Sequence, residues 1–145
     1  MLLNSASLAG LITQYTFNFF APATGIYLCV GTMPTDAQID AMTVATDALI
    51  TGNKAVSYGA IPATNFRAKD TNIPCLMYSA VMPVVTVVNS TKAGTLGWAV
   101  LHNGTGFAIA DVGLANSGAV VQVDTTTVII GTPVTLLTVS YKFGR

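Results

Sequence analysis

The scarcity of charged side chains is what most restricts the way this chain can fold. Only 8% of its 145 residues are Asp, Glu, Lys or Arg, against about 25% in an average soluble domain. All six acidic residues are Asp, the net charge is zero, and 52% of the residues are apolar. Since a net charge near zero promotes association, an isolated copy is expected to be poorly soluble. The composition favours a building block of an assembly, covered by copies of itself or by partners.

Length and hydropathy indicate one domain with a single hydrophobic core. A membrane-spanning helix needs about 20 consecutive apolar residues, and even the run from Met82 to Val88 is interrupted by Pro83 and Thr86. The first ten residues lack the basic stretch of a signal peptide. Zero net charge provides no attraction for nucleic acid. We therefore expect no export signal, no membrane partner and no nucleic-acid partner.

The residues capable of catalysis are isolated from one another. His102 is the only histidine, and its segment offers no carboxylate or nucleophile, so we expect a polar surface residue at a hairpin end. Asp36 and Asp40 lie four residues apart on one helix face; they could hold a cation, but a solvated face is the simpler interpretation. We predict that the chain is not an enzyme, with no catalytic residue, no metal site and no cofactor.

The two cysteines, Cys29 and Cys75, lack the spacing of a metal-binding motif. Both lie in apolar, strand-like runs, which favours two buried, reduced thiols. A disulfide within or between chains is the alternative, because a particle that ends up outside cells can oxidise late.

Helices are predicted only near the start of the chain. Residues 8–15 have apolar side chains at helical spacing, and residues 15–20 then alternate like a strand. Thr35 and Gln38 have the spacing of a capping box, with Asp36 in the first turn of a short helix. Residues 47–70 are weakly patterned, and we expect one or two short strands and a long loop there.

Alternating apolar residues predict strands through most of the remaining chain. Asn103-Gly104 is a strong hairpin signal. We predict an all-β fold, an antiparallel β-sandwich or jelly-roll-like domain over residues 21–145, with one or two short helices and an N-terminal arm or short helix at 1–20. The candidate strands are 25–31, 73–79, 82–88, 95–102, 106–110, 119–124, 126–130 and 134–143.

The alternation also predicts the core. Leu96, Trp98, Val100 and His102 share one face of their strand, and Trp98 is expected in the core rather than on a sugar-binding platform. The predicted core consists of Ile26, Leu28, Val30, Trp98, Val100, Ile109, Val121, Val123, Leu137, Val139 and Tyr141.

Four stretches carry a resemblance to a known group of proteins: Ile26–Ala37 (IYLCVGTMPTDA), Gly94–Leu101 (GTLGWAVL), Gly106–Val112 (GFAIADV) and Gly131–Thr135 (GTPVT). In this order they resemble small virion proteins of tailed bacteriophages, over residues 25–37 and 94–140. Residues 47–70 depart from that pattern and are interpreted as a specific insertion. The resemblance implies a location in the virion and no active site.

Composition and resemblance together predict a non-enzymatic structural component of a bacteriophage virion. It would be a homo-oligomer docked on the capsid, neck or tail, with other virion proteins as partners. The alternative is a host-surface or glycan-binding module of a tail fibre or baseplate. The candidate interface is the apolar N-terminal segment, which could instead pack on its own domain. Its residues are Leu8, Leu11, Ile12, Tyr15, Phe17, Phe19 and Phe20.

Overall fold

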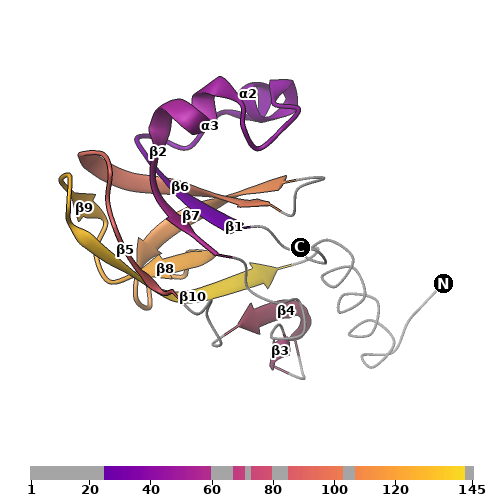
Figure 1. Ribbon diagram of the computed structural model, residues 1–145. Coiled ribbons are helices and arrows are strands. Elements are labelled where there is room, and N and C mark those ends of the chain that lie inside the picture. The colour runs from indigo at the N-terminus through magenta and orange to yellow at the C-terminus, as the bar shows by residue number, and fades with distance from the viewer. Residues whose placement is uncertain (1–24, 60–66, 71–72, 80–84, 103–106, 143–145) are drawn as a thin grey trace.

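The computed structural model describes residues 25–59, 67–70, 73–79, 85–102 and 107–142, with side chains described except at 67–70, 73–79 and 141–142. Strands dominate these ranges, accompanied by two six-residue helices (Figure 1). The predicted all-β fold with one or two short helices is confirmed. The N-terminal arm, residues 1–20, lies outside the described residues. In chain order the elements are β1 (Gly25–Val30), α2 (Asp36–Ala41), α3 (Ala48–Asn53), β2 (Lys54–Tyr58), β3 (Arg67–Asp70), β4 (Ile73–Ser79), β5 (Val87–Asn89), β6 (Gly94–His102), β7 (Phe107–Leu114), β8 (Val121–Val123), β9 (Thr127–Val128) and β10 (Pro133–Lys142).

The described strands form one ten-stranded sheet in the order β2-β1-β6-β7-β8-β10-β4-β3, with β5 paired to β10 and β9 to β6. Strands β7 and β8 are parallel, and the other described pairs are antiparallel. The sheet curls until its β2 end approaches β5 and β10. There the Thr91 N–H donates to the Ala55 carbonyl at 2.8 Å, and the Tyr58 hydroxyl donates to the Val134 carbonyl at 2.6 Å. These bonds hold the sheet nearly closed as a barrel.

Strand β1 is buried on both faces, because the sheet interior lies on one side and the two helices cover the other (Figure 1). Leu28 faces the interior core, whereas Cys29 faces a second, smaller core under the helices. The interior core comprises Ile26, Leu28, Val30, Ala55, Val56, Tyr58, Leu96, Ala99, Leu101, Ala110, Val121, Val123, Val128, Val134, Leu136 and Val139. The outer core comprises Cys29, Met42, Ile50, Trp98 and Val100.

The expectation that Leu96 and Trp98 share a face is wrong. Trp98 pairs with Cys29, but the next residue of β1, Val30, pairs with Leu96, so the register slips by one residue at Gly97. The extra residue turns Leu96 into the interior core and leaves Trp98 in the outer one. A bulge of this kind reverses the side-chain alternation beyond it.

A second bulge changes the expected alternation in β10. Leu136 pairs with Val123 and Thr138 with Gln122, so Leu137 is the extra residue. As a result Leu136 is buried, while the predicted core residue Leu137 is half-buried. Ile109 is also only half-buried, packed against the outer core, and the Tyr141 side chain lies outside those described. The other eight predicted core residues are confirmed as buried: Ile26, Leu28, Val30, Trp98, Val100, Val121, Val123 and Val139.

One helix follows the sequence prediction and the other departs from it. Thr35 and Gln38 form the expected capping box of α2, with the Thr35 N–H donating to Gln38 Oε1 at 2.9 Å. Helix α3 falls where strands and a loop were expected. Its N-cap is Asp47, whose carboxylate accepts the Leu49 N–H at 2.9 Å, and it is anchored by Ile50, which is fully buried in the outer core. The one or two short strands expected in this stretch are present as β2, directly after α3, and β3.

Candidate interaction surface

The most exposed large apolar side chains of the described structure gather along one ribbon of backbone. We define the β5–β10 ribbon as residues 85–89 together with residues 129–135. Four of the seven exposed large apolar residues lie in it: Val85, Val87, Ile129 and Ile130. Ile129 is 69% exposed and Ile130 is 73% exposed. Ile129 and Ile130 are adjacent in the chain, and exposed apolar side chains that lie together on a soluble domain commonly mark a binding site.

Strand pleating explains why Val87 is exposed. Val88 pairs with Val134, and both side chains pack toward the interior core. The neighbouring pair, Val87 with Thr135, therefore points to the opposite side. Val87 is exposed as a result, and the outer side of the ribbon offers apolar surface to solvent.

The turn that displays Ile129 and Ile130 is fixed by hydrogen bonds. The Ile129 N–H donates to Thr132 Oγ1, and the Thr132 N–H returns a bond to the Ile129 carbonyl, both at 3.0 Å. Two bonds tie the turn to the end of β5: Gly131 N–H to the Ser90 carbonyl at 2.7 Å, and Ser90 N–H to the Thr132 carbonyl at 2.8 Å. Gly131 adopts a φ of +89°, which suits glycine. The two isoleucines are held in place, so little ordering entropy is lost if a partner covers them.

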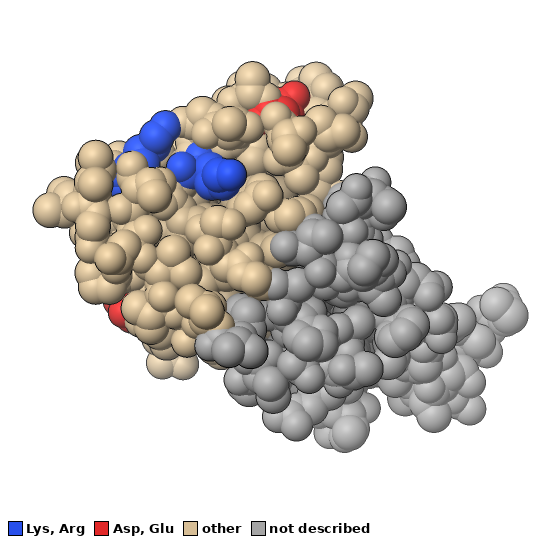
Figure 2. All heavy atoms as spheres, viewed as in Figure 1, with Lys and Arg blue, Asp and Glu red and all other residues tan. Residues whose placement is uncertain are grey.

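No charged residue occurs within the ribbon. Its nearest cation along the chain is Lys92, which donates from Nζ to the Gly52 carbonyl at the end of α3. The visible face of the molecule carries few charged atoms, and the blue and red ones are far apart (Figure 2). Asp36 and Asp40 are both exposed on α2, which agrees with a solvated helix face. The carboxylate nearest to the ribbon is that of the exposed Asp124, which accepts the Thr135 N–H at 2.7 Å, at the end of the ribbon away from the two isoleucines.

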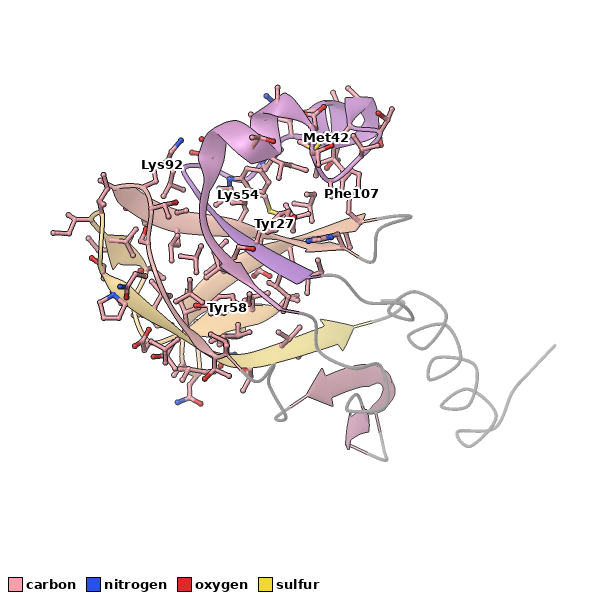
Figure 3. All side chains as sticks on the ribbon, viewed as in Figure 1. Tyr27, Met42, Lys54, Tyr58, Lys92 and Phe107 are labelled. Atoms are coloured by element: carbon pink, nitrogen blue, oxygen red, sulfur yellow. The ribbon has the colours of Figure 1, made fainter. Side chains whose placement is uncertain are left out.

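A polar and aromatic cluster lies on the outer face of the sheet, beside the helices. Lys54 Nζ sits 4.5 Å from the centroid of the Tyr27 ring, and the Tyr27 and His102 ring centroids are 4.3 Å apart. Figure 3 shows Lys54 beside Tyr27, with Met42 and Phe107 further along the same layer. Stacking of a cation on an aromatic ring is mildly stabilising, and it keeps the Lys54 stem against the sheet.

His102 does not occupy the surface position expected from the sequence. It is 7% exposed at the end of β6, because β1 and β7 flank that end of the strand. Burial lowers the pKa of its imidazole below the ordinary 6.5, and the nearby positive charge of Lys54 lowers it further. Among the described residues, no group of three or more His, Cys, Asp or Glu side chains has an arrangement that could hold a metal ion.

Cys29 behaves as the small apolar residue expected from its strand. It is fully buried in the outer core, with Sγ 4.0 Å from the Ile50 carbonyl oxygen. Burial raises the pKa of its thiol to about 12, despite the opposing charges of Lys54 and Lys92. It is a free cysteine, and a neutral thiol is neither a good nucleophile nor a metal ligand. The Cys75 side chain lies outside those described.

The structure does not place the interface residues predicted from the sequence. Leu8, Leu11, Ile12, Tyr15, Phe17, Phe19 and Phe20 all lie outside the described residues. The sequence pattern does not reveal the β5–β10 ribbon, because it predicts a strand over 126–130 that includes Ile129 and Ile130. The available signal was their position directly before Gly131-Thr132-Pro133, which places them in a turn, where large apolar residues are unusual.

Comparisons with known proteins found no match to a family model, to a curated protein or to a solved structure. Neither helix of the described chain is long and apolar enough to span a bilayer. The resemblance to phage virion proteins thus stays a prediction from the sequence.

Proposed function

We propose that this protein is a structural component of a bacteriophage virion that works by assembling with copies of itself. The observation that carries the proposal is the β5–β10 ribbon, in which a rigid turn exposes Ile129 and Ile130 with no charged side chain in the ribbon. Exposed apolar surface on a preordered element is suited to protein contact. The scarcity of charge over the whole chain supports the same interpretation.

The resemblance of residues 25–37 and 94–140 to small phage virion proteins supports a place on the capsid, neck or tail. We propose that the partners are other copies of this chain and the neighbouring virion proteins. In this role the chain decorates or extends a larger particle and performs no catalysis.

The alternative, a host-surface or glycan-binding module, requires exposed aromatic rings beside polar groups on loops. Trp98 and Tyr58 are instead buried in the two cores, and Tyr27 and Phe107 are half-buried. These described rings offer no platform for a sugar, so the assembly role is preferred.

Sedimentation velocity of the purified full-length chain tests the proposal. We expect concentration-dependent oligomers at micromolar concentration, and a smaller species when residues 1–20 are deleted. A full-length chain that stays monomeric at millimolar concentration would overturn the assembly role. Quantitative mass spectrometry of particles made by the phage that encodes the chain tests its location, with multiple copies per particle as the expected result.

A further inference from the structure

The isoleucine turn of the β5–β10 ribbon and the N-terminal segment attach to opposite ends of the curled sheet, whereas Val134, further along the ribbon, accepts a hydrogen bond from Tyr58, which pairs with Ile26. Strand β6 spans the distance between them: its first residue, Gly94, pairs with Val128 of β9, and its last, His102, pairs with Gly25. Nine residues of strand cover roughly 26 Å at about 3.3 Å per residue. In Figure 1, β9 lies at the left end, and the start of β1 points toward the right. Residues 1–24 therefore join the described structure far from the isoleucine turn.

The segment and the ribbon match in chemistry. No charged residue occurs before Asp36, and residues 8–20 are rich in Leu, Ile, Tyr and Phe. The ribbon likewise lacks charge and exposes Val85, Val87, Ile129 and Ile130. Contact between the segment and the isoleucine turn would bury apolar surface, which avoids the cost of removing ions from water; the Asp124 carboxylate bonds Thr135 at the other end of the ribbon.

Building on the proposed assembly role, we propose that the N-terminal segment of one copy docks on the β5–β10 ribbon of the next copy. Two different surfaces at opposite ends produce a head-to-tail contact. Such heterologous contacts generate a closed ring or an open filament, whereas a two-fold dimer forms only where two copies exchange their segments reciprocally. Each copy would thus offer one donor segment and one acceptor ribbon.

The test separates donor from acceptor in the full-length chain. The ribbon variant carries Ile129→Thr and Ile130→Thr, and the segment variant carries Phe17→Ser, Phe19→Ser and Phe20→Ser. The control variant, Val44→Thr with Leu114→Thr, changes two exposed apolar residues outside the ribbon. The turn hydrogen bonds of Ile129 use its backbone N–H and carbonyl, so the ribbon variant should fold, as circular dichroism would verify.

We expect the ribbon and segment variants each to lose at least 100-fold in association constant by sedimentation equilibrium, while the control assembles like the original chain. In a mixture, the intact N-terminal segment of the ribbon variant can dock on the intact ribbon of the segment variant. Only this one contact is possible, so the mixture should form a one-to-one heterodimer and nothing larger. Absence of the heterodimer, or normal assembly of the ribbon variant, would overturn the docking proposal while leaving the assembly role intact. A monomeric original chain would overturn the assembly role itself.

Cross-linking provides a second measurement that does not depend on removing side chains. A photoreactive amino acid at position 130 is activated in a mixture of ¹⁴N- and ¹⁵N-labelled chains, and cross-linked peptides are identified by mass spectrometry. Cross-links joining light and heavy chains between position 130 and residues 8–20 are expected. Cross-links confined to a single chain, or to other segments, would overturn the docking proposal.

Discussion

Replacing Trp98 by Ala should strongly destabilise the fold, because this side chain joins β6 to the helical layer. Trp98 is 1% exposed and shares the outer core with Met42 and Ile50. Its indole N–H also donates to the Val30 carbonyl at 3.3 Å. Truncating a buried Trp to Ala costs about 3–5 kcal/mol, and a lost hydrogen bond accounts for roughly 1 kcal/mol. We expect Trp98→Ala to lower the free energy of unfolding by about 4 kcal/mol.

A milder variant separates packing from hydrogen bonding. Trp98→Phe keeps an aromatic ring in the outer core but removes the indole donor and some volume, so we expect a loss of about 2 kcal/mol. Both losses are a large part of the roughly 5–15 kcal/mol that stabilises a typical domain.

Urea unfolding followed by far-UV circular dichroism provides the measurement, since Trp98 is the only tryptophan and its fluorescence disappears in both variants. With a slope of about 2 kcal/mol per molar urea, the midpoint should fall by about 2 M for Trp98→Ala and about 1 M for Trp98→Phe. A loss below about 1 kcal/mol for Trp98→Ala would refute the reasoning, because it would mean that the helical layer is not packed on the sheet.

Four further outcomes follow from particular contacts. A Cβ at Gly97 would overlap the Gly31 carbonyl oxygen, so Gly97→Ala should lower the free energy of unfolding in urea by up to about 3 kcal/mol. At Gly52 in α3 a Cβ meets nothing within 4 Å, so Gly52→Ala should raise the free energy of unfolding by about 0.5–1 kcal/mol. Thr35→Ala should lower stability by about 1 kcal/mol through loss of the α2 cap, and Thr35→Ser should retain most of it. Burial raises the pKa of the Cys29 thiol to about 12. In a Cys75→Ser variant Cys29 is the one remaining cysteine, and it should react with a disulfide reagent at pH 8 only after unfolding. Rapid reaction of the native protein would contradict the assigned burial. Burial is the main reason why the pKa of His102 is lowered in the folded state. The unfolded chain therefore binds more protons just below pH 6.5, and stability should fall as the pH drops from 7.5 to 5. The His102→Gln variant should show a flatter pH dependence of stability, and an unchanged slope would contradict this reasoning.

Local signals predicted the elements that depend on neighbouring residues. The capping box at Thr35 and Gln38 could be recognised because both partners lie within one turn of helix. The Asn103-Gly104 signal correctly indicated a hairpin, since β6 and β7 pair from His102 with Phe107 onward. Each of these features is decided by a few adjacent residues, and a single sequence contains that information.

The misassigned features depend on contacts between distant segments. The bulge at Gly97 exists where the Gly31 backbone approaches β6; a glycine inside a strand indicates that a bulge or a close approach is possible, but the segment that approaches lies far away in the sequence. Helix α3 has only six residues, too few to be stable alone, and its Ile50 is buried against the outer core. The parallel pairing of β7 with β8 likewise joins residues that are not adjacent, and the Asp111 carboxylate of β7 accepts the N–H of Val120, just before β8, at 2.9 Å.

The helical layer also changes what the low charge implies. A sheet with one solvated face needs alternating polar residues, but β1 and the second half of β6 are buried on both faces and hold consecutive apolar side chains, as in residues 98–101. Part of the 52% apolar content is therefore absorbed by two cores within one chain. The second core does not account for the exposed Val85, nor for Val87, Ile129 and Ile130, which are exposed although a paired strand holds Val87 and a hydrogen-bonded turn holds the two isoleucines. The support for assembly thus rests on the β5–β10 ribbon more than on the composition, and substitutions in the ribbon should affect assembly without affecting folding.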